Sequence, residues 1–144
     1  MAFAYRQENV VFLGPAEWEY AYRAGSTMRF SFGDDESYSL IWQYAWYGRN
    51  SGSTTHTVGQ KEPNAWGLYD MHGNVWEWCS DWYSESYTAG AQTDPKGAGG
   101  GSDRVVRGGS WSSSPQGCRS ADRPCYTPTY TSILLGFRLV RNVP

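Results

Sequence analysis

The chain has 144 residues and a formal net charge of −2, which suits one domain over residues 1–144 with its own hydrophobic core. Its basic residues form no run, so nucleic acid and anionic membrane surfaces are excluded as electrostatic partners, and no apolar stretch approaches the roughly 20 residues that insert across a bilayer. Aromatic residues reach 17% and charged residues only 18%, a balance typical of loop-rich folds and of recognition surfaces.

The first predicted element is a helix over residues 15–25. Pro15 opens it, acidic residues lie in its first turn, and Gly25 is a typical stop signal. Trp18 and Tyr22 are four residues apart and therefore share one face, which we expect to be buried.

The rest of the chain favours short strands and long loops. Residues 33–59 are polar and rich in turn formers, and we expect them to be irregular, held by their aromatic rings. Residues 64–83 mix short strand signals with glycine turns. Two further strands are predicted over 104–107 and 136–140, and the residues between them, 112–135, show no period. The predicted fold class is α+β.

Few residues suggest catalysis. Cys79, Cys118 and Cys125 allow at most one disulfide and lack the spacing of metal-binding cysteines. His56 and His72 are too few and too far apart to predict a zinc site or a general base. The sequence also lacks a Ser-His-Asp order, a phosphate-binding loop and a dinucleotide fingerprint.

Three motifs, together with AEWEYA at residues 16–21, carry a resemblance to a known family. They are NAWGLYDMHGNVWEWCSDWY at 64–83, RVVRGGSW at 104–111 and GFR at 136–138. This combination resembles the formylglycine-generating-enzyme (sulfatase-modifying factor) family over most of the chain from residue 15 onward. The resemblance implies a C-type lectin fold of that type, with few helices, short strands and long ordered loops. Within the family, the sequence specifically resembles the variable proteins of diversity-generating retroelements.

The oxidases of this family hold copper with two cysteines that follow the GGS turn closely, because thiolates select Cu(I). Here Ser112, Ser113 and Ser114 stand at the early position, and hydroxyls cannot replace a thiolate. Cys118 and Cys125 follow with six residues between them, a wider gap than the family's. A copper-dependent formylglycine-generating or related oxidase therefore stays as the alternative. We predict a binding protein with no catalytic residue.

Residues 112–135 have the composition of a diversified segment. In the variable relatives, random replacement of adenines in AAC codons cannot produce Lys, Gln, Glu, Met or Trp. These five types supply 24 of residues 1–111, whereas Gln116 is their one member among the 24 residues of 112–135. The sequence thus predicts a ligand-binding display protein whose C-terminal segment is diversified by a retroelement. The alternative is a loop that merely tolerates change.

The resemblance and the composition together predict which positions vary: Ser112, Ser113, Ser114, Gly117, Asp122, Pro124, Cys125, Tyr126, Thr127, Tyr130, Ser132, Ile133 and Leu134. Tyr126 and Tyr130 are expected to anchor the ligand as flat amphipathic rings. The framework of the segment is predicted to be Gln116, Pro128 and two salt-bridged arginines, Arg119 and Arg123.

The expected partner is a variable protein or a cell-surface ligand, and the oligomeric state is left open. The first 13 residues do not pair a basic stretch with an apolar one, so no signal peptide is predicted. A virion or cell surface would then be reached through a partner or a non-classical route.

The resemblance also implies a structural calcium ion at the NVWEW turn. Its ligands would be Asp70, the carbonyls of Gly73 and Val75, and Glu77, because Ca²⁺ takes 6–8 oxygen ligands. The alternative is that both carboxylates bond to backbone groups or to arginine. The remaining aromatic residues of the motifs are interpreted as core rather than as a sugar-stacking platform: Trp66, Trp76, Trp78, Trp82 and Trp111.

Overall fold

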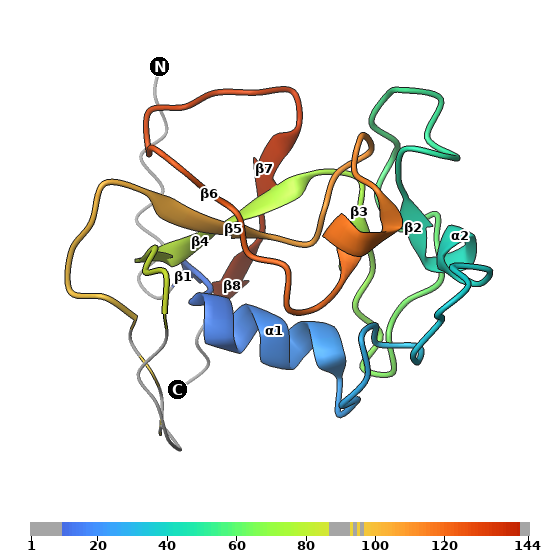
Figure 1. Cartoon of the computed structure of the whole chain (residues 1–144), viewed down its shortest axis with the longest axis horizontal. Helices are drawn as coiled ribbons and strands as arrows, with labels where there is room; N and C mark the ends of the chain where they lie inside the picture. Colours follow the sequence, from blue (N-terminus) through green and yellow to red (C-terminus); the bar gives the residue numbers. More distant parts are fainter. Residues whose placement is uncertain (1–9, 87–92, 94, 96, 142–144) are drawn as a thin grey trace.

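The structure is a computed structural model that describes residues 10–86, 93, 95 and 97–141. Figure 1 shows a twisted central sheet, with helix α1 (Pro15–Arg23) below it and the short elements α2 (Ile41–Tyr44), β2 (Ala45–Trp46) and β3 (His72–Gly73) gathered at the right-hand end. Within the described part of the chain, no helix is both long and apolar enough to cross a bilayer.

Helix α1 forms where the sequence predicts it. The Glu17 carboxylate accepts a hydrogen bond of 2.9 Å from the Gly14 amide and so satisfies a free donor at the helix start. The helix ends where Ala24 adopts a left-handed conformation, with φ of 47°. Trp18 and Tyr22 are buried, as expected, and they anchor α1 against the sheet.

The central sheet has the strand order β6-β5-β4-β7. Strand β4 pairs antiparallel with β5 and parallel with β7, and β6 adds to the far edge of β5. Two smaller sheets pair β1 with β8 and β2 with β3. The strand bounds are β1 Val10–Phe12, β4 Trp76–Trp82, β5 Arg104–Arg107, β6 Cys125–Tyr126, β7 Leu135–Phe137 and β8 Leu139–Arg141.

The prediction of one strand over 136–140 is wrong, because the chain leaves the central sheet at Arg138. Strand β7 ends just before this residue, and β8 begins just after it in a different sheet. The Arg138 side chain forms an ion pair of 2.8 Å with Glu77 on β4. This non-local ion pair accompanies the change of sheet, which the run of strand-forming residues does not reveal.

Two buried clusters form the hydrophobic core. The first lies between α1 and the central sheet and contains Trp18, Tyr22, Met71, Cys79 and Val105. The second lies under α2 and contains Phe30, Ile41, Ala45, Tyr47 and Cys118. The second cluster includes Cys118, so segment 112–135 contributes a side chain directly to the core.

The interpretation of the motif tryptophans as core holds for one of the five. Trp76 is buried, whereas Trp66 is 48% exposed and packs edge to face against Tyr20, which is also exposed. Trp78, Trp82 and Trp111 are half-buried. Trp78 follows Glu77 and precedes Cys79, both of which face α1, so its ring lies on the other face of β4.

Candidate functional site

Segment 112–135 runs across one side of the molecule (Figure 1). It leaves β5, forms the 3-10 helix η1 (Pro115–Cys118) near β2 and β3, returns through β6, and arches over to β7. Three of its residues are buried: Pro115, Cys118 and Ser120. None of these three is a predicted variable position.

All thirteen predicted variable positions are exposed or half-buried. The exposed ones are Ser112, Ser114, Thr127, Tyr130 and Ile133. The half-buried ones are Ser113, Gly117, Asp122, Pro124, Cys125, Tyr126, Ser132 and Leu134. The buried residues of the segment therefore all lie outside the predicted variable set, although Gln116 and Pro128, which also lie outside it, are exposed.

Two tyrosines give this surface an aromatic centre. The rings of Tyr126 and Tyr130 are stacked, with centroids 4.9 Å apart and an angle of 17° between their planes. Trp78 on β4 meets Tyr126 edge to face at 6.4 Å. Ile133, which is 77% exposed, lies farther along the segment, and its carbonyl accepts a hydrogen bond from the Trp111 indole.

The scaffold holds the segment largely through backbone atoms. The Tyr22 hydroxyl donates to the carbonyl of Cys118 at 2.7 Å, and Ser120 N–H donates to the carbonyl of Arg29 at 3.0 Å. The Arg107 guanidinium donates to the carbonyls of Ser120 and Asp122 at 3.0 and 2.9 Å. Such bonds are insensitive to most side-chain replacements, since every residue carries the same carbonyl group.

The start of the segment is held in the same way. Gly48 N–H donates to the carbonyl of Ser113 at 2.9 Å, and the Ser51 hydroxyl donates to that of Trp111 at 2.7 Å. A Cβ on Gly48 would lie 3.0 Å from the Ser113 oxygen, so only glycine allows this close approach without a shift. The backbone N–H of Trp111 in turn donates a hydrogen bond to the carbonyl of Asn74.

Sequence reasoning missed these anchoring residues. Tyr22, Arg107 and Gly48 lie 13 to 96 positions from the segment residues whose carbonyls they bind. No local pattern marks a residue that will contact a distant carbonyl, although an arginine directly after two valines in a predicted strand is a weak signal of a buried charge.

The predicted framework residues behave differently from one another. Gln116 and Pro128 are exposed. Arg119 donates to the carbonyl of Gln116 at 2.9 Å, and Arg123 donates to those of Ser84 and Glu85 at 2.7 and 2.9 Å. Both arginines thus donate to backbone carbonyls, and their salt bridges stay a prediction.

The environment of the thiols does not favour a copper pair. Cys118 is fully buried in the second core cluster, and burial raises its pKa to about 12. Cys125 is half-buried on β6, and burial also raises its pKa. Both side chains are free thiols, as is that of Cys79. Copper in the oxidases is held by two thiolates, whereas here Cys118 lies inside a core cluster and Cys125 lies on strand β6.

Neither histidine is placed for acid–base catalysis. His72 is buried between the Ser31 hydroxyl at 2.8 Å and the carbonyl of Cys118 at 3.3 Å, and burial lowers its pKa to about 3. His56 stacks on Trp46 at 3.7 Å, and its ring is bonded to the Ser51 carbonyl. Both rings support neighbouring loops.

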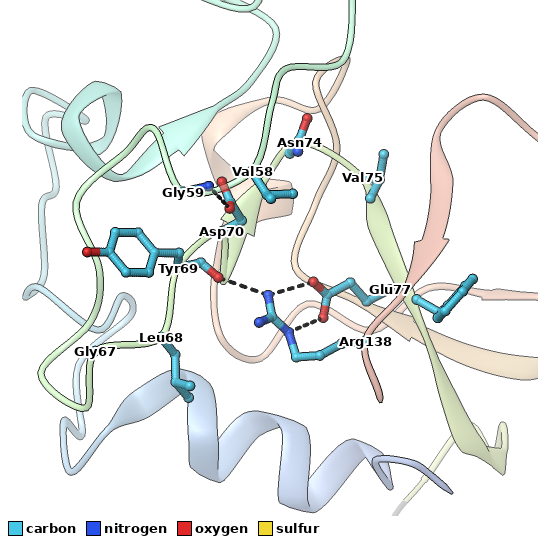
Figure 2. A pocket seen from close by; sticks show the side chains of 12 residues that line it. Val58, Gly59, Gly67, Leu68, Tyr69, Asp70, Asn74, Val75, Glu77 and Arg138 are labelled. Atoms are coloured by element: carbon cyan, nitrogen blue, oxygen red, sulfur yellow. Dashed lines mark hydrogen bonds and ion pairs between the residues drawn. The ribbon is translucent and has the colours of Figure 1, made fainter. Parts of the chain in front are cut away.

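The four predicted calcium ligands do come together around one hollow of about 480 Å³, shown in Figure 2. Asp70 points toward Gly59, and its carboxylate accepts a hydrogen bond of 2.7 Å from the Gly59 amide. Both carboxylate oxygens of Glu77 accept hydrogen bonds from the Arg138 guanidinium, at 2.8 and 3.0 Å. One of them also accepts a hydrogen bond of 2.7 Å from the Trp18 indole N–H.

This arrangement does not fit a calcium ion. The Glu77 carboxylate is already neutralised by a guanidinium, which would repel a second cation at that distance. Asp70 is bound to backbone and Glu77 to arginine, which is the alternative considered for them above. Among the described residues, no group of three acidic, histidine or cysteine side chains is placed to hold a metal.

Comparison with solved structures defines the fold class. The chain is similar to variable protein 1 of Treponema denticola, with 43% identity and a TM-score of 0.84 over 90% of this chain and 46% of that one. It is also similar to PvdO from Pseudomonas aeruginosa, with 36% identity and a TM-score of 0.81 over 93% of this chain and 53% of that one. The fold is the C-type lectin fold of the formylglycine-generating-enzyme type, as predicted.

The family model for the sulfatase-modifying factor enzyme 1-like domain matches residues 1–143, and the chain belongs to this family. It is 42% identical to the formylglycine-generating enzyme of Streptomyces coelicolor, over 88% of this chain and 45% of that protein. It is 37% identical to the serine/threonine-protein kinase pkn1 of Chlamydia pneumoniae, over 89% of this chain and 20% of that protein. The chain thus spans less than half the length of these curated relatives.

Proposed function

We propose that this chain is a ligand-binding protein whose recognition surface is segment 112–135, and that a retroelement diversifies the thirteen variable positions. The observation that carries the proposal is the division within the segment. Its buried residues are Pro115, Cys118 and Ser120, while every predicted variable position is exposed or half-buried. The likeness to a protein named a variable protein supports the same function.

The backbone anchoring supplies a physical reason for the division. Tyr22, Arg107 and Gly48 bind carbonyl oxygens of the segment, so a change of side chain at the surface leaves these bonds in place. A loop held in this way keeps its shape while its chemistry changes. Antibody loops on a rigid scaffold use the same separation of support and recognition.

The present side chains favour a protein ligand with an apolar contact region. Tyr126 and Tyr130 offer stacked rings, and Ile133 adds apolar area. Asp122 is the one variable position with a charged side chain, and partial burial raises its pKa. Aromatic residues with few charges are typical of the centre of protein interfaces.

A tolerance experiment tests the proposal without knowledge of the ligand. Replacing Tyr126 and Tyr130 together by alanine should change the melting temperature by only a few degrees, because Tyr130 is exposed and Tyr126 is only half-buried. A library that varies all thirteen positions should likewise yield mostly folded protein by protease resistance. A matched library at Pro115, Cys118 and Ser120 should yield mostly unfolded protein.

The opposite result would overturn the proposal. Collapse of the double tyrosine variant would show that the rings support the fold. Diversification by a retroelement has a separate test. The DNA downstream of the coding sequence should carry a near-copy of codons 108–140 with AAC triplets, beside a gene for a reverse transcriptase. Without that copy, the segment is a tolerant loop and not a diversified one.

The second candidate function is that of an oxidase, favoured by the 42% identity to a formylglycine-generating enzyme. The residues speak against it, because serines 112–114 stand at the early cysteine position and Cys118 is buried as a thiol. Copper-dependent oxidation of a cysteine-containing peptide by the purified protein would establish this candidate instead.

A further inference from the structure

The hollow beside β4 contains a buried carboxylate whose counter-charge comes from within the chain. We propose that the Arg138 guanidinium stands where a divalent cation would otherwise bind Glu77. The fold is then independent of calcium, and a cation site opens only when Arg138 is removed. Ligand binding by segment 112–135 plays no part in this inference.

The need for a counter-charge follows from burial. Glu77 is 6% exposed, and an isolated ionised carboxylate in that position would be strongly destabilising. Arg138 satisfies it with two parallel bonds, from Nε at 3.0 Å and from a terminal nitrogen at 2.8 Å. Charge-assisted, bidentate bonds of this kind are among the strong hydrogen bonds of proteins. Trp18 adds a third donor at 2.7 Å.

The guanidinium is fixed from two further directions. Its terminal nitrogen also donates to the carbonyl of Tyr69 at 2.9 Å, a contact visible in Figure 2. Its own backbone lies at the change from β7 to β8, where two sheets hold the flanking residues. The cation is therefore placed by the fold itself, and it cannot diffuse away as a metal ion can.

The lining of the hollow is the reason to expect metal binding once the guanidinium is gone. Asp70, Gly73 and Val75 line the same hollow as Glu77, and its volume of about 480 Å³ leaves ample room for an ion with bound water. Oxygen ligands of this kind suit Ca²⁺. On this proposal, the positive charge of Arg138 beside the carboxylate opposes binding in the natural chain.

Thermal unfolding tests the proposal, with calcium chloride and EDTA as the probes. We expect the melting temperature of the natural chain to be the same with EDTA and with millimolar Ca²⁺. We expect Arg138→Met to lower it by about 10 °C in EDTA, because an unpaired carboxylate stays buried. Millimolar Ca²⁺ should then restore several degrees, and calorimetric titration should detect binding to the variant alone.

Two further variants serve as controls. Arg141→Met removes an exposed positive charge three residues away and should show neither the loss nor the response to calcium. Arg138→Lys keeps the charge without the bidentate geometry, so it should be moderately destabilised and indifferent to calcium even if the methionine variant does not fold. A natural chain that loses stability in EDTA would overturn the proposal. A folded methionine variant that ignores calcium would overturn it too.

Discussion

Three thiols in one chain illustrate how position decides the chemistry of a residue. Cys79 and Cys118 are buried, and burial raises the pKa of each to about 12. Cys125 is half-buried on β6, at the edge of the central sheet. Since the thiolate is the reactive form, exposure and pKa together should separate these residues.

We expect iodoacetamide to modify Cys125 first in the native protein, with Cys79 and Cys118 unmodified until the chain unfolds. Mass spectrometry of proteolytic fragments would measure the order, and labelling in denaturant would show that all three thiols are competent. Modification of Cys118 at the rate of Cys125 would contradict the buried placement and strengthen the oxidase candidate.

At the scale of elements, the 3-10 helix η1 joins segment 112–135 to the core. It packs against the turn at Gly109, which has φ of +85°. A Cβ at this glycine would lie 2.6 Å from the Cys118 sulfur and 3.0 Å from the Gly117 carbonyl. The RGGSW motif therefore requires glycine for two reasons, backbone conformation and space.

We expect Gly109→Ala to lower the free energy of unfolding by about 3 kcal/mol or more, because strain and collision with η1 add. Gly25→Ala is the matched control: its φ is +90°, and no heavy atom lies within 4 Å of the added Cβ. That variant should lose only about 1 kcal/mol. Equal losses in urea unfolding would show that the contact with η1 contributes nothing.

At the scale of the whole molecule, a single neutral histidine makes stability depend on pH. His72 contacts the rings of Tyr22, Phe30 and Phe32 and bonds to Ser31, so it joins the two core clusters. Burial lowers its pKa to about 3, whereas the unfolded chain takes up the proton near 6.5. Between these values the unfolded state binds more protons, so stability is full above pH 6.5 and falls as the pH drops.

Because proton binding is linked to folding, we expect His72 to lower the free energy of unfolding by roughly 1 kcal/mol for each pH unit below pH 6. His72→Gln should unfold more readily at neutral pH but show a shallower pH dependence down to pH 4. His56→Gln, at a histidine outside the core clusters, is the control. Identical pH profiles for His72→Gln and the natural chain would show that another group is responsible.

Much of the fold and part of the site could be predicted because their signals are local. Helix α1 is marked by Pro15 and Gly25 and by the spacing of Trp18 and Tyr22, and β5 by its valines. The motifs at 64–83 and 104–111 predicted the family and hence the C-type lectin fold. The family resemblance and the composition of residues 112–135 together predicted thirteen variable positions, and none of these positions is buried in the structure.

The tertiary structure alone decided which distant groups meet. It paired Arg138 with Glu77 across 61 positions, ended β7 at that arginine, and placed Arg107 beneath the carbonyls of Ser120 and Asp122. It also left Trp66 on the surface. Spacing along the chain encodes periodicity and turns, which depend on neighbouring residues. A buried charge instead takes its partner from whichever donor the packed fold brings within about 3 Å, and that choice exists only once the elements have assembled.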